Sequence, residues 1–150
     1  MASQYVVFDL NGQRYALRLS LVDRVVRMVH ITPLSGAPDI VLGAVNIAGR
    51  VVPIINLRQR FGLPKREIRL TDWLIFAQTE RRPVALVADA VLDVVECYEP
   101  NLISAENILP GLKYLEGVMK YEDGLVLIHN LDKFLSLEEE NSLDLALLTH

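Results

Sequence analysis

Short apolar runs separated by turn-forming residues run along the chain and predict a structure built mainly of β-strands. Tyr5–Leu10 is followed by Asn11-Gly12, the dipeptide that a tight type I′ hairpin turn favours, and Arg14–Leu19 then predicts the returning strand. Trp73–Gln78 and Val84–Ala88 predict a second hairpin in the same way. Many short strands joined by glycine-containing turns favour a barrel or a sandwich over an α/β fold.

A few short segments interrupt this β pattern. Ser20–Asp23 has the spacing of a capping box and predicts a helical turn on which Val22 and Val25 share a face. Leu57–Phe61 predicts a brief helix, and the acidic, leucine-rich residues from about 138 to 150 predict a C-terminal helix or tail. Pro53 lies inside an apolar strand and restricts that strand to an edge or a bulge, because proline cannot donate to the ladder.

Residues 39–63 carry a pattern that recurs later in the chain. Gly43 and Asn56-Leu57 have counterparts in Gly117 and Asn130-Leu131, both at the same offset along the chain, and an apolar strand lies between them in both copies. Repeats of this length usually indicate two copies of one supersecondary unit, although chance similarity among Val- and Leu-rich strands is the alternative. A duplicated β unit without catalytic residues indicates a scaffold or an adaptor.

The repeat extends upstream into the hairpins. Tyr5–Phe8 is similar to Trp73–Phe76, so this alignment places Val7 opposite Ile75. The Val-x-x-Val pair that begins at Val22 recurs at Val91. Each half is therefore predicted to contain a hairpin, a Val-x-x-Val segment, a loop, a glycine, a strand and an Asn-Leu step.

Length and composition indicate one domain that spans all 150 residues. No apolar run approaches the ~20 residues of a membrane-spanning helix, and the first residues lack the pattern of a signal peptide, so direct membrane insertion is not expected. Cys97 is the only cysteine, which indicates a cytoplasmic protein without an internal disulfide. A net charge of −4 argues against nucleic-acid binding, and a solvated loop explains the basic residues between Arg58 and Arg69 better than a phosphate site does.

No catalytic or metal-binding constellation is evident. His129 lies inside an apolar strand, where a core or surface histidine is expected more often than a metal ligand. Cys97 beside two valines fits a small apolar core residue better than a nucleophile. Asp89 and Asp93 are four positions apart, but turn capping explains them at least as well as acid–base chemistry. We therefore expect no enzyme activity, no cofactor and no metal.

Residues 43–58, GAVNIAGRVVPIINLR, closely resemble the G-V-x-N-L-R-G-x-x-x-P-[IV]-[IV]-[DN]-L-R signature of the CheW family of chemotaxis coupling proteins. Ile31-Thr32-Pro33 resembles the I-T-P loop of that family, and Tyr114–Val118 resembles its Y-[IL]-x-G segment. Together, these blocks extend the resemblance from about Tyr5 to Leu137.

The resemblance implies two SH3-like five-stranded β-barrel subdomains around a shared hydrophobic core, with a few short helices and a C-terminal helix. It implies a non-catalytic cytoplasmic signalling adaptor that couples chemoreceptors to a CheA-type histidine kinase, in chemotaxis or a related chemosensory pathway. The implied partners are the regulatory domain of that kinase and the cytoplasmic tip of methyl-accepting chemoreceptors, so the protein would be recruited to receptor arrays at the membrane.

The resemblance also implies two sets of partner-binding residues. An aliphatic groove between the subdomains would bind the receptor, and a loop that contains the signature would contact the kinase or the receptor. The groove positions are Val6, Leu19, Val22, Val25 and Val91, and the loop positions are Arg24, Gly43, Asn46, Ala48, Gly49 and Arg50. Core packing is the alternative explanation for the valines, and a backbone requirement is the alternative for Gly43.

Two positions depart from the family pattern. Ala48 replaces the arginine of N-L-R-G, and Arg24 replaces an acidic residue that some members carry. If the loop is extended, Arg50 would project to the same side as residue 48 and partly replace the missing guanidinium. A small-ligand-binding or enzymatic β-barrel that uses the groove as a pocket remains the alternative function, and a purely aliphatic groove would favour the adaptor.

Overall fold

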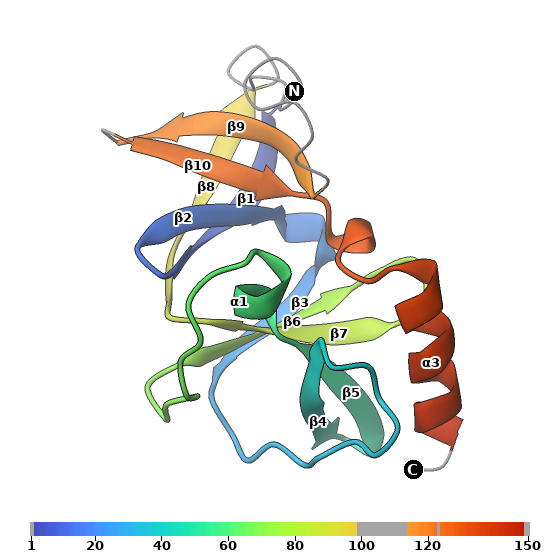
Figure 1. Ribbon diagram of the computed structural model, residues 1–150. Helices are drawn as coiled ribbons and strands as arrows, with labels where there is room; N and C mark the ends of the chain where they lie inside the picture. The colour runs from blue at the N-terminus through green and yellow to red at the C-terminus, as the bar shows by residue number, and fades with distance from the viewer. Residues whose placement is uncertain (1, 99–113, 123, 149–150) are drawn as a thin grey trace.

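Two five-stranded sheets, one above the other, make up most of the computed structural model, which describes residues 2–98, 114–122 and 124–148 (Figure 1). In each sheet one neighbouring pair of strands is parallel and the other pairs are antiparallel. The upper sheet has the order β8 (Ala90–Tyr98), β1 (Ala2–Leu10), β2 (Gln13–Arg18), β10 (Gly124–His129) and β9 (Leu115–Tyr121). The lower sheet has the order β3 (Val22–Arg27), β6 (Trp73–Gln78), β7 (Pro83–Ala88), β5 (Arg50–Ile55) and β4 (Val41–Ile47).

Short helices connect the strands, and a longer helix ends the described chain. They are η1 (Leu19–Leu21), α1 (Leu57–Arg60), η3 (Leu131–Lys133) and α3 (Leu137–Leu148). The Asn56 side chain accepts a hydrogen bond from the Gln59 N–H and so caps α1. Ser136 and Glu139 form a reciprocal capping box at the start of α3, with N···O distances of 2.8 and 3.1 Å. The predicted fold class, mainly β with a C-terminal helix, is confirmed.

The duplication appears in the topology as an exchange of hairpins between the two halves. The hairpin β1–β2 from the first half joins β8, β9 and β10 from the second half, while β6–β7 joins β3, β4 and β5. If β1 to β5 are matched in order with β6 to β10, the strand order of the upper sheet becomes the strand order of the lower sheet. Each sheet therefore contains strands from both halves, so neither half forms its own sheet.

The pairing registers repeat in the same way as the sequence does. Ile54 pairs with Ala85 in the lower sheet, and Ile128 pairs with Ala16 in the upper sheet, so Ala16 and Ala85 are equivalent positions. Across the hairpins, Val7 pairs with Ala16 and Phe76 pairs with Ala85. Val7 therefore corresponds to Phe76 and not to Ile75, so the predicted alignment of the first strands is wrong by one position.

Strands β1, β2, β6 and β7 are buried on both faces, which explains why they are apolar runs without clear alternation. Tyr5 and Val7 of β1 face a small core within the upper sheet, whereas Phe8 and Leu10 face the main core. In the lower sheet, Leu74 of β6 likewise faces a local core on the opposite side from the main core. The main core contains residues of both sheets and of α3, so the two sheets share it.

Pro53 lies in an interior strand. The sequence allowed either an edge position or a bulge for this proline, and the edge position is wrong. β5 has β4 on one side and β7 on the other. Ala44, opposite Pro53, exchanges its backbone hydrogen bonds with Thr32 instead, at 2.8 and 2.9 Å. Pairing of β5 with β7 begins only at Ile54. The ladder tolerates the proline because neither neighbouring strand requires a donor from it.

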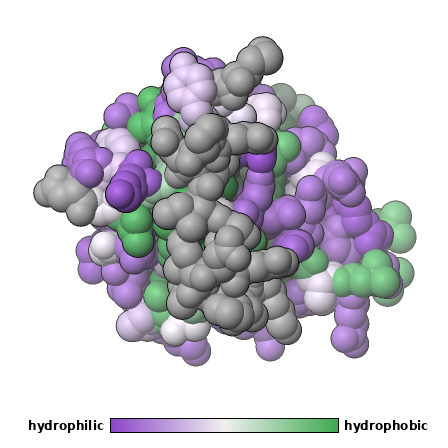
Figure 2. Space-filling view, turned by 90° about the horizontal axis from the view of Figure 1, so that it is seen from above, coloured by the Kyte–Doolittle hydropathy of each residue, from purple (hydrophilic) through white to green (hydrophobic). Residues whose placement is uncertain are grey.

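Helix α3 packs beside the lower sheet, and arginines hold it there (Figure 1). Its inner residues Leu143 and Ala146 are buried in the main core. Arg82, itself buried, contacts Glu140 at 3.2 Å and also pairs with Asp144. The outer face exposes Leu137, Leu145 and Leu148, and Figure 2 shows hydrophobic groups among polar ones on this side of the molecule.

The sequence predicted a solvated loop for the basic residues between Arg58 and Arg69. This prediction is wrong for three of them, which form ion pairs. Arg58 and Arg66 donate to the two oxygens of Asp89 at 2.7 and 2.6 Å, and Arg60 donates to Glu139 at 2.6 Å. Burial would raise the pKa of Asp89, but the hydrogen bonds from the Asn11 N–H and the two guanidinium groups hold it below its usual value. Asp89 therefore joins the first hairpin turn to α1 and the following loop.

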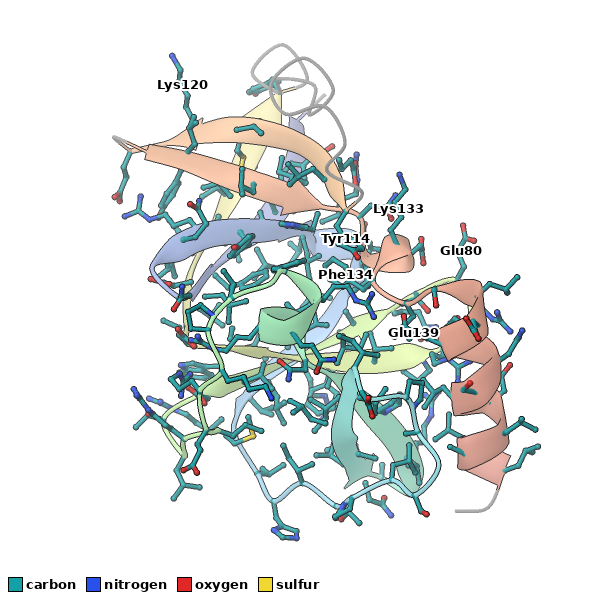
Figure 3. The ribbon with its side chains drawn as sticks, viewed as in Figure 1. Glu80, Tyr114, Lys120, Lys133, Phe134 and Glu139 are labelled. Carbon is teal, nitrogen blue, oxygen red and sulfur yellow. The ribbon has the colours of Figure 1, made fainter. Side chains whose placement is uncertain are left out.

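An aromatic cluster fills the space between the upper sheet, α1 and η3. It contains Tyr15, Phe61, Tyr114, His129 and Phe134. His129 is buried and stacks on Phe61 with 4.5 Å between the ring centroids. Figure 3 shows Tyr114 and Phe134 next to each other near the start of α3. His129 is thus a core residue. The sequence favoured either a core or a surface histidine at this position over a metal ligand.

Candidate docking groove

A hollow of about 450 Å³, called the groove below, opens between β3, the β4–β5 turn and the adjoining ends of β6 and β7. Its floor is apolar and includes Val22, Ile47, Val52 and Phe76. Its polar lining residues are Ser20, Asp23, Arg24, Arg50 and Gln78. All of these polar residues are exposed, so the groove has an apolar base with a polar rim.

The β4–β5 turn at one side of the groove has left-handed backbone at both central residues. Ala48 has φ of +51° and Gly49 has φ of +81°, and Ile47 pairs with Arg50 across the turn. These angles are those of a type I′ turn, which matches the twist of a hairpin. The Asn46 side chain accepts a hydrogen bond from the Gly49 N–H at 3.1 Å and closes the turn.

Alanine is a costly residue at the first position of this turn, because its Cβ disfavours the left-handed region. We expect Ala48→Asn to stabilise the protein by about 0.5–1 kcal/mol and to raise Tm by roughly 1–4 °C, since Asn tolerates that region well. Ala48→Val is the matched control and is expected to destabilise, because a β-branched side chain suits positive φ least. Thermal melting of both variants tests this. Equal Tm values would contradict a left-handed residue 48.

The structure brings together four residues that belong to the two predicted sets. Val22 from the receptor-groove set lines the groove together with Arg24, Ala48 and Arg50 from the loop set. Leu19 lines an adjoining hollow of about 290 Å³ that shares Ser20 with the groove. Two predicted regions distant in sequence thus form one continuous surface beside η1.

The other aliphatic positions are mainly core residues. Val6 is buried at 3% exposure, and Val25 and Val91 are half-buried against the main core. None of these three is among the residues that line the groove. Core packing therefore accounts for their positions, and a role in receptor binding stays a prediction.

Val22 and Val25 share a face, but for a different reason from the predicted helical turn. The segment forms η1 and then strand β3, on which residues three apart would normally face opposite sides. Val22 pairs with Ala77 and Arg24 with Phe76, so Asp23 is an extra residue in a β-bulge. The bulge turns Val22 back to the core side, where Val25 also packs.

Gly43 is buried and does not line the groove. It has φ of +152°, and a Cβ built on it would lie 2.6 Å from Ile31 Cγ2 and 2.6 Å from the Thr32 carbonyl oxygen. The Ile31-Thr32 segment therefore approaches too closely for any side chain at residue 43. The glycine thus has the backbone role that was the alternative explanation, and a partner contact there stays a prediction.

The prediction that Arg50 projects to the same side as residue 48, and so replaces an arginine there, assumed an extended loop. That assumption is wrong. The turn is left-handed at residues 48 and 49 rather than extended, so the two-residue alternation of side chains does not apply. Ala48 and Arg50 nevertheless line the same groove. Arg50 is thus available to that surface by tertiary placement.

Sequence reasoning missed the part of the groove that β6 and β7 contribute. Phe76, Ala77, Gln78 and Pro83 line it, although they are distant in the chain from residues 20–24 and 47–52. Nothing in their local pattern distinguishes them from other hairpin residues. The groove also departs from a purely aliphatic lining, because its rim is polar.

Two further features of the described residues bear on function. Among residues 2–98, 114–122 and 124–148, no group of three or more His, Cys, Asp or Glu side chains is placed to hold a metal ion. Within those same ranges, no helix has the length and hydropathy to cross a membrane.

Known proteins of one kind match the chain over most of its length. A CheW-like domain family model matches residues 4–139. The chemotaxis protein CheW of Rhizobium meliloti is 26% identical over 141 residues, which covers 93% of this chain and 91% of that protein. CheW of Bacillus subtilis is 28% identical over 139 residues, covering 91% of this chain and 89% of the relative.

A solved structure agrees with these sequence relatives. The scaffolding protein TtCheW from Thermoanaerobacter tengcongensis superposes with a TM-score of 0.84 at 27% identity, covering 93% of this chain and 96% of that one. The fold and the matched signature thus define a duplicated β adaptor domain. The chain belongs to the CheW-like family.

Proposed function

We propose that this protein is a chemotaxis scaffold that couples chemoreceptors to a CheA-type histidine kinase and has no turnover of its own. The observation that carries the proposal is the match of the CheW-like family model to residues 4–139, together with relatives that are chemotaxis and scaffolding proteins. The alternative of an enzymatic β-barrel has no support from these relatives. Among the described residues that line the groove, Asp23 is the single carboxylate, and no His or Cys accompanies it to form an acid–base pair.

The finer parts of the proposal concern partners and place. The regulatory domain of the kinase and the cytoplasmic tip of a methyl-accepting receptor are the proposed partners, and the protein acts in the cytoplasm at receptor arrays. The exposed rim and apolar base of the groove support a docking role, because interfaces commonly join an apolar centre to a polar rim. Such contacts usually bury about 800 Å² per partner, so the groove would be one part of a larger interface.

Calorimetric titration tests this proposal. The purified protein is titrated separately into the regulatory domain of the cognate kinase and into a soluble fragment of the cognate receptor tip. We expect saturable binding to both partners. The absence of heat with either partner, for protein shown to be folded by thermal melting, would reject the adaptor assignment.

Val22→Asp locates the receptor contact within the groove. Val22 is half-buried at the groove, and a carboxylate there would place an unpaired charge in the apolar base. We expect receptor binding to fall at least tenfold and kinase binding to change by no more than a few fold. Val29→Asp is the control, because Val29 is 44% exposed and lies outside the groove. If Val22→Asp folds and binds the receptor like the control, residue 22 is not part of the contact.

A further inference from the structure

The groove combines an apolar base with two arginines that come from different strands. Arg24 lies on β3 and Arg50 begins β5, and both are exposed at the rim. The two residues are separated in sequence by a loop and by β4. The fold therefore places two positive charges around one hydrophobic hollow.

These two arginines differ from most others in the described part of the chain, which are engaged by partners inside the molecule. Arg58, Arg66 and Arg82, for example, form ion pairs at sites where their side chains are at most 18% exposed. The nearest carboxylate oxygen to Arg24 is 3.7 Å away on the adjacent Asp23, and the two side chains are 55% and 73% exposed. Within the described ranges, Arg50 has no ion-pair partner.

The charge that lines the groove is opposite in sign to the net charge of the chain. The chain has a net charge of −4, yet among the described residues that line the groove Asp23 is the single acidic one, against Arg24 and Arg50. A local excess of positive charge at a concave, partly apolar surface attracts carboxylates and repels ammonium and guanidinium groups. An arginine beside an apolar pocket also offers directed hydrogen bonds to a carboxylate.

We propose that the groove selects an acidic segment of a partner protein, in which an apolar side chain enters the base while neighbouring carboxylates pair with Arg24 and Arg50. The two arginines are then the residues that determine specificity, and a partner segment with basic residues at the same places is excluded. This inference rests on the proposed adaptor function and adds the chemistry of the partner at that site.

The test uses two synthetic ten-residue peptides that need no knowledge of the natural partner. In one peptide leucine alternates with glutamate, and in the other leucine alternates with lysine. Each is titrated into the isotope-labelled full chain while NMR follows the methyl signals of Ile47 and Val52, which line the groove. We expect the glutamate peptide to shift these signals and to bind at least tenfold more tightly than the lysine peptide.

Charge reversal assigns the preference to the two arginines. Arg24→Glu/Arg50→Glu should reverse the preference between the peptides, and each single variant should reduce it severalfold. Arg69→Glu changes the same charge at an exposed arginine outside the groove, and it should leave the preference within twofold. Because the three positions are exposed, thermal melting is expected to show folded variants.

Each other outcome overturns the proposal. No methyl shift with the glutamate peptide, or equal binding of both peptides, removes the acidic selectivity. An equal effect of Arg69→Glu would show that only net charge matters. The calorimetric titrations with the kinase domain and receptor tip are independent of the peptides, so a failure of acidic selectivity is distinguishable from a failure of the adaptor function.

Discussion

Gly43→Ala is expected to destabilise the protein by roughly 3 kcal/mol, because overpacking and the loss of two backbone hydrogen bonds add together. The new Cβ would lie 2.6 Å from the Thr32 carbonyl oxygen. That oxygen accepts from the Ala44 N–H at 2.8 Å, and the Thr32 N–H donates to the Ala44 oxygen at 2.9 Å. The alanine can fit only if residues 31–32 move away and both bonds weaken. Urea unfolding at neutral pH measures the change.

Gly12→Ala is the matched control for this prediction. Gly12 also has positive φ, +79°, but a Cβ there would meet no atom within 4 Å. Its expected cost is only the ~1 kcal/mol of left-handed backbone. If the two variants lose similar stability, the close approach of the Ile31-Thr32 segment is not the reason for glycine at residue 43.

The second large effect is a loss of stability in mild acid that depends on His129. Burial lowers the pKa of His129 from 6.5 to about 4, and a hydrogen bond to the Leu127 backbone only partly opposes this shift. The unfolded chain therefore binds a proton at higher pH than the folded chain does. The stabilising contribution of neutral His129 is complete above pH 6.5 and is lost as the pH falls toward 4. We expect a loss of about 2–3 kcal/mol between pH 7 and pH 4.5.

His129→Phe separates this effect from other acid-sensitive groups. Phenylalanine keeps a ring stacked in the aromatic cluster and does not titrate, so the unfolding free energy should vary little between pH 6.5 and 4.5. The lowered pKa values of Asp89 and Glu139 act in a more acidic range, below the usual values of these carboxyls. His30→Asn is the control, because His30 is exposed. An unchanged pH slope in His129→Phe would contradict a buried, neutral histidine.

Acid sensitivity also bears on any measurement of partner binding. The His129 ring lies against Phe61 and Phe134, which are the C-cap residues of α1 and η3. Its protonation would place a charge among aromatic rings with no described partner at Nδ1. Binding experiments at pH 7 and above therefore compare variants with this cluster intact.

The repeat is the part of the fold that the sequence predicted most fully. The spacing along the chain that relates Gly43 to Gly117 also relates two irregularities in strand pairing, one beside each glycine. Val41 pairs with Ile55 and Leu115 with His129, and in both strands the next residue is skipped before pairing resumes. The same glycine-marked bulge was therefore encoded twice, because the local backbone requirement recurs at the same spacing.

The sequence did not reveal how the two copies combine. Apolar strands that are buried on both faces carry no signal for which core each face joins, and this allowed the one-position error in the alignment of the first strands. Local pattern also cannot show that hairpins are exchanged between halves, because pairing partners far apart in the chain leave no periodic trace. For the same reason the sequence left an edge position open for Pro53, because local pattern does not show which strands pair with β5.

The amino-acid sequence by itself determined the β-rich class, the hairpin turns, the duplication and the resemblance to a coupling family, because these depend on local propensity and spacing. Tertiary structure alone decided that Val22, Arg24, Ala48 and Arg50 share one groove with residues of β6 and β7. It also decided that Gly43 is buried beneath a crossing segment and that Arg58, Arg60 and Arg66 are ion-paired. The physical reason is that packing and ion pairing join residues distant in the chain, whereas sequence patterns report only the conformation of neighbours.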